Sequence, residues 1–161
     1  GPQCSTPLRF RIVENDIEND LTRQLSLAID NFVEDSELGR GVDRNGYFDQ
    51  TRDAMVNAIM GEGELWVGTL DEQLVIYILA GFTHEVDGLP TYWVSQAWVR
   101  KDQRGLPWVK QAWETIRSRA KEMKCAHIVT ISGRENNQAY CRFLGPGWHI
   151  YGTLLKEDLY G

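Results

Sequence analysis

The chain has 161 residues, of which 42% are hydrophobic and 25% charged. These values are typical of one soluble globular domain and exclude disordered and fibrous proteins. The longest apolar run, from Leu74 to Phe82, is shorter than the roughly 18 residues of a membrane span, so no membrane partner is expected. The three cysteines, at positions 4, 125 and 141, have neither disulfide nor zinc spacing, which predicts free thiols in a reducing cytoplasm and no metal site.

The charge of the chain is unevenly distributed. Residues 1–99 hold 6 Lys and Arg against 17 Asp and Glu, whereas residues 100–142 hold 10 against 4. The net charge of −6 argues against a nucleic-acid partner. The basic segment could receive a phosphorylated small molecule, although a solvated helix face would give the same pattern.

Hydrophobic periodicity predicts elements in the order βααβββαβαβ. They are a strand over 8–12, a helix that starts after Asn15 or Asp16 and reaches Phe32, a weaker helix over 48–60, strands over 64–70, 73–82 and 91–99, a helix over 107–123, a strand over 126–132, a helix over 136–144 and a strand over 148–155. The strand over 73–82 is apolar almost throughout, so it is predicted to be central in its sheet. Asp71-Glu72 before it is a tight hairpin turn. Residues 1–7 are interpreted as a tag scar and disordered start, and residues 8–161 as a single domain.

The junction between the strand over 91–99 and the following helix is chemically suited to a pyrophosphate. The first N–H groups of a helix have no intrahelical partners, and the helix dipole adds partial positive charge there. Arg100, Lys101 and Arg104 add full charges. Many α/β proteins have such a turn without a ligand, so this signal is weak when taken alone.

Residues 99–109 resemble the acetyl-CoA signature of the GNAT N-acetyltransferase superfamily, Val-x-Pro-Glu-x-Arg-Gly-x-Gly-x-Gly/Ala. Val99, Asp102, Arg104 and Gly105 fit, whereas Lys101, Pro107 and Val109 replace the proline, the first loop glycine and the last small residue. Residues 136–148 resemble the superfamily's Asn-x-x-Ala-x-x-x-Tyr-x-x-x-Gly-Phe through Asn136, Ala139, Gly147 and Trp148. The resemblance covers residues 8–160 and implies an α+β fold whose mixed, mostly antiparallel central sheet is flanked by helices.

The resemblance also implies acetyl-CoA as acyl donor and direct transfer of the acetyl group to an amine. The residues expected to bind the donor are Val99, Arg100, Arg104, Gly105, Leu106, Trp108, Val109, Asn136 and Phe143. The pyrophosphate is expected at the N–H groups of 104–109, and a backbone N–H near Val99 is expected to face the thioester oxygen. Because Pro107 removes one donor and Val109 adds bulk, weakened or altered binding stays an alternative.

Two residues are expected to handle protons. The superfamily tyrosine that protonates the leaving thiolate falls at Phe143, and Tyr140, one helical turn earlier, either replaces it or only packs. Glu85 is the preferred base among His84, Glu85 and Asp87 in the loop before the strand over 91–99, since a carboxylate attracts a cation and accepts its proton.

Ser95 is expected to line the pocket and to hold a water. Alternation along the strand places it on one face with Trp93, Ala97 and Val99. None of these side chains is a good base, which is why the base is sought in the preceding loop.

The acceptor is expected to be a small-molecule or protein amine. In the superfamily the first two helices and their connecting loop wall the acceptor site, and here that wall carries Glu34, Asp35, Glu37, Asp43 and Asp49. These acids favour a cationic acceptor such as a polyamine, an amino sugar or a lysine side chain, unless they serve only solubility. The superfamily usually has two strands after the last helix, so the second is either lost or supplied by a partner chain in a homodimer.

Two other hypotheses stay open. A catalytically inactive GNAT-fold binding or structural protein, for example a virus-encoded one, is favoured by Pro107, Val109 and Phe143. An unrelated α+β binding domain with no CoA site is the third. Intact binding of CoA distinguishes the first hypothesis from the second.

Overall fold

A computed structural model describes residues 7–35, 43–85, 87–132, 134 and 136–159. The tag scar predicted at the start lies outside these residues except for Pro7. The elements are β1 (Arg9–Ile12), α1 (Asn19–Asp35), α2 (Arg44–Ile59), β2 (Glu64–Leu70), β3 (Gln73–His84), β4 (Pro90–Val99), the 3-10 turn η2 (Lys101–Gln103), α3 (Pro107–Glu122), β5 (His127–Thr130) and α4 (Asn137–Leu144).

One five-stranded sheet runs through the molecule in the order β1-β2-β3-β4-β5. The first four strands are antiparallel, and β5 is parallel to β4. β3 is therefore central, and its residues Leu74 to Ala80 are all buried. These observations confirm the predicted mixed, mostly antiparallel sheet with helices on its faces and the central place of the apolar strand.

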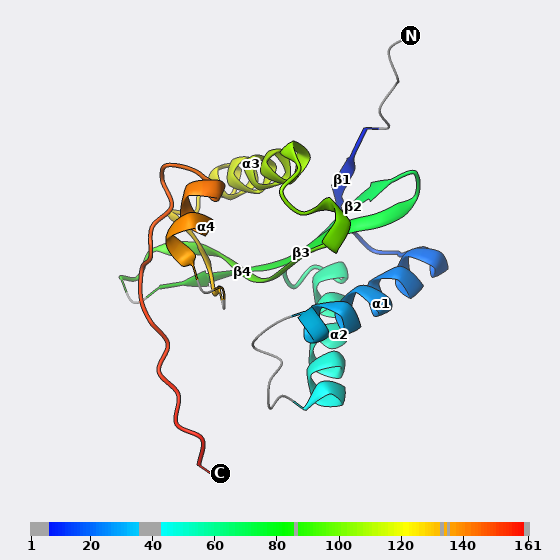
Figure 1. Cartoon of the computed structure of the whole chain (residues 1–161), viewed down its shortest axis with the longest axis horizontal. Coiled ribbons are helices and arrows are strands. Elements are labelled where there is room, and N and C mark those ends of the chain that lie inside the picture. The colour runs from blue at the N-terminus through cyan, green and yellow to red at the C-terminus, as the bar shows by residue number, and fades with distance from the viewer. Residues whose placement is uncertain (1–6, 36–42, 86, 133, 135, 160–161) are drawn as a thin grey trace.

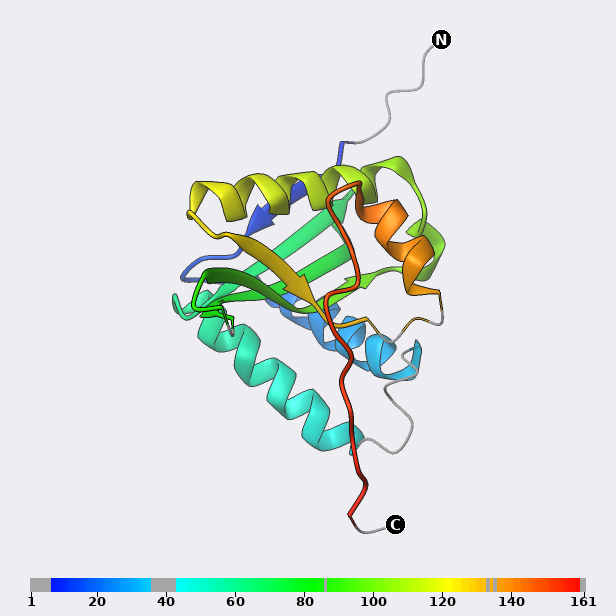
Figure 2. The same cartoon turned by 90° about the vertical axis from the view of Figure 1, so that its left-hand side faces the viewer.

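Helices cover both faces of the sheet, α1 and α2 on one side and α3 and α4 on the other (Figure 1, Figure 2). Each helix turns an apolar stripe inward, because residues three and four apart lie on one face. In α3 the buried residues are Val109, Ala112, Trp113, Ile116 and Ala120. We refer to the two layers of core as the α1/α2 side and the α3/α4 side. None of the described helices is both long enough and apolar enough to cross a membrane.

Local side-chain chemistry sets several boundaries that periodicity alone does not. α2 begins at Arg44 rather than at 48, because the Asp43 side chain caps it by accepting a hydrogen bond from the N–H of Gly46. Asp71 and Glu72 both have positive φ, 49° and 66°, which confirms the predicted tight turn and gives it the hand that suits a two-residue hairpin.

The predicted final strand over 148–155 is wrong. Trp148 packs edge-on against Trp113 of α3, with ring centroids 5.8 Å apart, and from there to residue 159 the described chain has no regular strand. A strand needs a neighbouring ladder, and nothing in the described residues pairs with this segment. Its apolar side chains are left in solvent, with Leu154 74% and Leu155 91% exposed.

Candidate functional site

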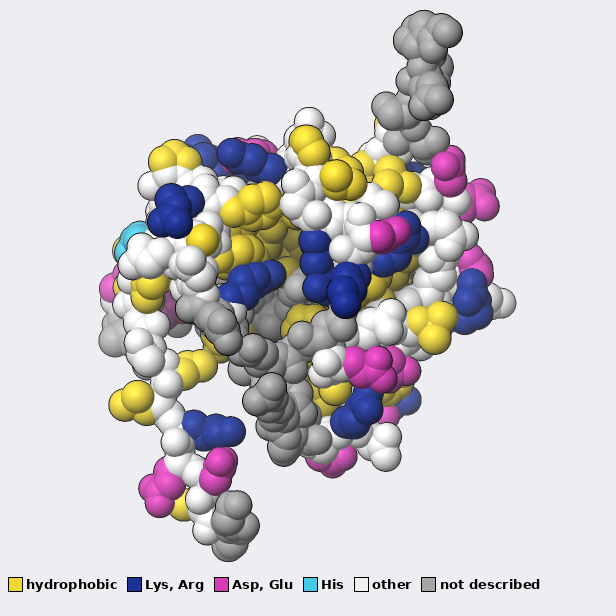
Figure 3. All heavy atoms as spheres, in the orientation of Figure 1, with side chains coloured by type: hydrophobic (Ala, Val, Ile, Leu, Met, Phe, Trp, Pro, Cys, Tyr) yellow, Lys and Arg dark blue, Asp and Glu magenta, His cyan; other side chains and the backbone are white. Residues whose placement is uncertain are grey.

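The site begins where β4 and β5 separate. The two strands pair only from Thr91–Val94 to His127–Thr130, and the hydroxyl of Thr130 donates to the carbonyl of Val94 at the end of this ladder. Beyond it, the rest of β4 pairs with β3 alone among the residues that are described. Figure 3 shows a hollow here, between α4 and the β4–α3 junction, with hydrophobic side chains inside and Lys and Arg side chains on its walls.

A β-bulge lies at the point of separation. Opposite β3, Leu79 pairs with Gln96 and Ala80 with Val94, so Ser95 is an extra residue in β4. The Ser95 hydroxyl donates to the carbonyl of Leu79 at 3.2 Å. Ser95 is therefore fixed at the mouth of the divergence, with its lone pairs still able to accept a hydrogen bond from water.

The bulge changes which side chains share a face of β4. Val94 and Ala97 both pack on the α3/α4 side, and Val99 joins them there. Trp93, next to Val94, must then lie on the α1/α2 side. The prediction that Trp93 shares a face with Val99 is wrong, because strict alternation fails across an extra residue.

The backbone of Val99 faces the hollow. The N–H of Arg100 donates to the carbonyl of Val75 at 2.8 Å, which makes these two residues a hydrogen-bonded pair. Bonded and non-bonded pairs alternate in an antiparallel ladder, so the neighbouring pair of Val99 and Ile76 directs its N–H and C=O groups away from each other's strand. The side chain of Arg104 accordingly reaches back and donates from Nε to the carbonyl of Val99 at 3.0 Å.

The loop that follows has a glycine where its geometry requires one. Gly105 has a φ of +80°, and a Cβ there would meet open space, so the residue is needed for its conformation and leaves its surroundings accessible. Pro107 takes the first position of α3, which suits a residue without an N–H. Arg100 pairs with Asp102 at 2.7 Å.

Some of the N–H groups predicted to meet a pyrophosphate are already used. The N–H of Leu106 donates to Gln103 at 3.4 Å and that of Val109 to Leu106 at 3.0 Å. Pro107 has none. The indole of Trp108 also bonds to the Gln103 side chain, at 3.1 Å. The loop thus offers fewer backbone donors than the residue range 104–109 suggests.

On the opposite wall, α4 presents two aromatic rings. Asn136 caps the helix by accepting from the N–H of Ala139 at 3.0 Å. Tyr140 and Phe143 stack with centroids 6.4 Å apart and pack against the α3/α4 side. Burial raises the pKa of Tyr140, while the charge of Arg134 acts in the opposite direction.

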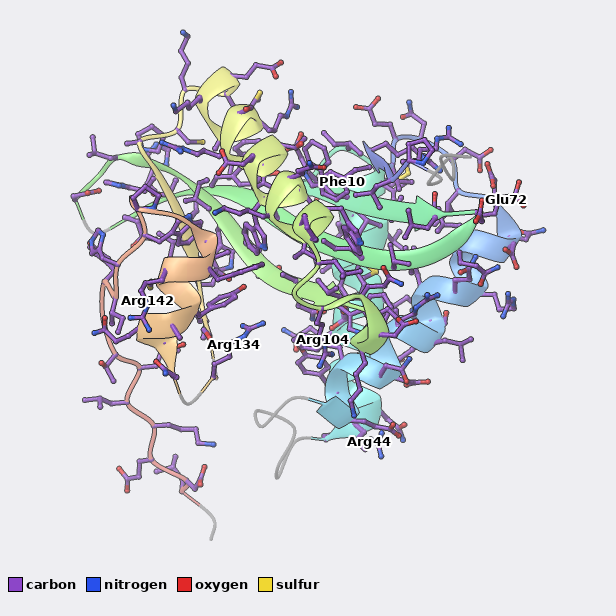
Figure 4. All side chains as sticks on the ribbon, turned by 45° about the horizontal axis from the view of Figure 1, so that its top comes forward. Phe10, Arg44, Glu72, Arg104, Arg134 and Arg142 are labelled. Carbon is purple, nitrogen blue, oxygen red and sulfur yellow. The ribbon has the colours of Figure 1, made fainter. Side chains whose placement is uncertain are left out.

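Arg134 is a site residue that the sequence did not single out. Its guanidinium carbon lies 3.7 Å from the centroid of the Tyr140 ring, a cation–π contact. Figure 4 shows it projecting from the β5–α4 connection toward Arg104 on the other side of the hollow. Its place in the basic segment was visible in the sequence, but its contact with Tyr140 was not.

The expected base, Glu85, is not brought to the hollow. It follows β3 at the end of β4 that carries Pro90, and its N–H donates to Leu89. Val99 lies at the other end of a ten-residue strand, about 30 Å away at roughly 3.3 Å per residue. The neighbouring Asp87 is occupied with His127 at 3.0 Å. The structure therefore does not support Glu85 as the base.

A chain of neutral polar groups lies beside the bulge on the α1/α2 side. The buried Tyr77 donates its hydroxyl to Gln96 at 2.7 Å, and the amide of Gln96 donates to Thr51 of α2 at 2.7 Å. Burial raises the pKa of Tyr47, while hydrogen bonds with Thr51 and Gln96 oppose the shift. These contacts join residues far apart in the sequence, so no local pattern could predict them.

The acids expected to rim the acceptor site are mostly engaged locally. Glu34 pairs with Arg44 at 2.9 Å, and Asp49 lies 3.7 Å from Arg52. Asp43 caps α2. The Asp35 side chain and Glu37 lie outside the described residues. In the described part of the chain, no three His, Cys, Asp or Glu side chains are grouped to hold a metal ion.

Solved acetyltransferase structures share the fold of this chain. A GNAT family acetyltransferase from Staphylococcus aureus superposes with a TM-score of 0.63 at 12% identity, over 94% of this chain and 98% of that one. Aminoglycoside N-acetyltransferase AAC(6')-Iy in complex with CoA gives 0.66 at 13% identity over 100% and 99%, and AAC(6')-Ih from Acinetobacter baumannii gives 0.65 at 13% over 95% and 99%. No protein-family model and no curated protein matches the sequence. The chain has the GNAT fold.

Proposed function

We propose that this chain is an N-acetyltransferase that passes the acetyl group of acetyl-CoA directly to an amine. The observation that carries the proposal is the separation of β4 from β5 at the Ser95 bulge, with the N-terminus of α3 at the end of β4. A structural neighbour holds CoA in the same fold, which supports an acyl-CoA donor here. The open space at Gly105 and the positive N-terminal end of α3 fit the phosphates of an acyl-CoA.

Each residue of the hollow has a distinct task in this proposal. The N–H of Val99 stabilises the thioester oxygen as that oxygen gains charge. The amine nitrogen bonds to the carbonyl carbon as the carbon–sulfur bond breaks, and Tyr140 gives the departing thiolate its proton. With Glu85 distant, a water held by the Ser95 hydroxyl takes the proton from the amine.

We infer an acceptor that arrives as a cation, supported by the acidic balance of residues 1–99. Because Glu34 is paired with Arg44, it contributes little net negative charge next to the site. The inference therefore rests on the net negative charge of residues 1–99 as a whole. The half-buried thiols of Cys125 and Cys141 support a reducing compartment such as the cytoplasm. The apolar residues exposed after Trp148 support a homodimer.

Binding and turnover test the proposal separately. Acetyl-CoA at a hundred times its Kd should stabilise the protein by about 2.7 kcal/mol in a thermal-shift measurement. Arg104→Glu should abolish binding by calorimetry, whereas Arg117→Glu, an exposed α3 residue paired with Glu114, should not. When spermidine, an aminoglycoside and a lysine peptide are each mixed with acetyl-CoA and the protein, at least one of them should give release of the CoA thiol.

The inactive binding protein is the second candidate, favoured by the N–H groups that Leu106 and Val109 use within the loop. It predicts weak or absent CoA binding and no thiol release for any amine. Absence of CoA binding would contradict the acetyltransferase and favour this candidate.

A further inference from the structure

We propose that Arg134 binds the pyrophosphate of CoA from the wall of the hollow opposite α3. A side chain of the β5–α4 connection would then supply the contact that the 104–109 loop lacks. The inference rests on the proposed function, because it names how that donor is held. It adds a residue that neither the sequence motifs nor the comparisons assign.

The α3 wall of the hollow is short of hydrogen-bond donors for a pyrophosphate. Pro107 has no N–H, and the N–H groups of Leu106 and Val109 point to carbonyls of their own loop. A pyrophosphate carries several oxygens that each accept hydrogen bonds. A loop depleted in this way needs help from a side chain elsewhere if CoA is to bind tightly.

Arg134 is held in place before any ligand arrives. Its guanidinium lies 3.7 Å above the Tyr140 ring, and that ring stacks on Phe143 in the core of the α3/α4 side. Nη1 also lies 3.5 Å from the hydroxyl of Ser132. A guanidinium that is already oriented loses less conformational entropy on binding and can offer two parallel N–H groups to a phosphate.

The positive charge of Arg134 is available to an anion. Within the described residues no carboxylate lies within ion-pair distance of it, in contrast to Arg100 with Asp102 and Arg119 with Glu64. Figure 4 shows Arg134 directed across the hollow toward Arg104. An anion in the hollow would be attracted by the positive charges of both side chains.

Calorimetry with matched ligands tests the assignment. Arg134→Ala should weaken CoA binding on the order of tenfold or more, since it removes hydrogen bonds to a charged group. It should leave the affinity for S-acetylpantetheine, which has no pyrophosphate, unchanged. Arg134→Lys should restore part of the loss, because lysine keeps the charge but not the stacked, two-pronged geometry.

Arg142→Ala is the control, because Figure 4 shows Arg142 on the side of α4 away from the hollow. It should bind CoA like the wild type. Equal loss of CoA and S-acetylpantetheine in Arg134→Ala would overturn the inference by showing that Arg134 only supports Tyr140. An unchanged CoA affinity with a raised acceptor KM would overturn it in favour of an acceptor contact. Failure of the wild type to bind CoA would instead contradict the proposed function as well.

Discussion

Three buried side chains and the half-buried Arg119 form a hydrogen-bonded group that joins β2, β4 and α3. Trp66 donates from its indole to the hydroxyl of Tyr92 at 2.9 Å, and Tyr92 donates to Glu64 at 2.8 Å. Arg119 of α3 closes the group with a 2.6 Å contact to the other oxygen of Glu64. The charge of Glu64 is thus compensated inside the protein, so each member depends on the others.

Tyr92→Phe should lower the free energy of unfolding by about 1–3 kcal/mol, because it leaves the Trp66 indole without its acceptor and leaves Oε1 of Glu64 with only its 3.2 Å hydrogen bond from Arg119. Urea denaturation followed by fluorescence measures this. Tyr151→Phe is the matched control, since Tyr151 is 65% exposed, and it should change nothing. Equal stabilities for the two variants would show that water replaces the lost hydroxyl.

Stability should also fall in alkali. Burial raises the pKa of Tyr77 and of Tyr92 above the ordinary value of 10.0. In the unfolded chain these phenols ionise near pH 10, whereas in the folded chain they hold their protons to higher pH, so ionisation favours unfolding. The contribution is complete below pH 10 and decreases as the pH rises toward the folded-state pKa. Urea unfolding at pH 8, 10 and 11 tests this, and Tyr77→Phe should flatten the decrease. A constant free energy of unfolding across this range would contradict the burial of these hydroxyls.

The hydrophobic periodicity of the sequence predicted most of the helices and strands. The stripe of α3 and the apolar run of β3 are strong local signals, and both elements formed where they were expected. The Ser95 bulge has no such signal, because an extra residue in a strand is decided by the neighbouring strand. The segment over 148–155 looked like a strand, but a strand exists only when another pairs with it.

The local parts of the site were predictable from the sequence, whereas the contacts between distant elements were not. The motif over 99–109 located the loop and the helix N-terminus, which depend on residues adjacent in sequence. The contact of Arg134 with Tyr140 and the hydrogen bond of Gln96 to Thr51 depend on which elements meet in space. The distance of Glu85 from Val99 was already implied by the sequence, because the two residues lie at opposite ends of the strand predicted over 91–99.

The first turn of α3 offers a substitution with two opposing effects. Pro107→Ala adds an N–H at the helix start, where a phosphate can use it, so CoA should bind several-fold more tightly. The same change frees the unfolded chain and should lower the free energy of unfolding by about 0.4–1 kcal/mol. Calorimetry and urea denaturation on one preparation measure both effects. Unchanged CoA affinity would show that the pyrophosphate does not reach this turn.

Among the described residues, the chain after Trp148 forms neither a helix nor a strand of the sheet. Ile150 and Leu154 are 52% and 74% exposed, and in the described residues this segment joins no sheet. Such apolar side chains are stabilised by contact with another surface. The segment is therefore where copies of the chain are expected to associate.

Deletion of 149–161 should change the free energy of unfolding of the monomer by no more than about 0.5 kcal/mol, because exposed residues contribute little. It should also reduce self-association, measured by sedimentation velocity across protein concentrations. Leu154→Lys should act in the same direction without shortening the chain. A large loss of stability at low protein concentration would mean that the segment folds onto its own molecule.

Because β4 separates from β5, the two halves of β4 should differ in their rates of hydrogen–deuterium exchange. Amides in Thr91–Val94 lie between two strands, whereas that of Val99 points away from β3, beyond the end of β5. An amide that meets water exchanges far faster than one bonded on a ladder. Without ligand, peptides ending at Val99 should take up deuterium within seconds while those over 91–94 stay protonated. Within β4, acetyl-CoA should slow uptake at Val99 and leave 91–94 unchanged, so deuterium uptake at Val99 reports whether the donor is bound.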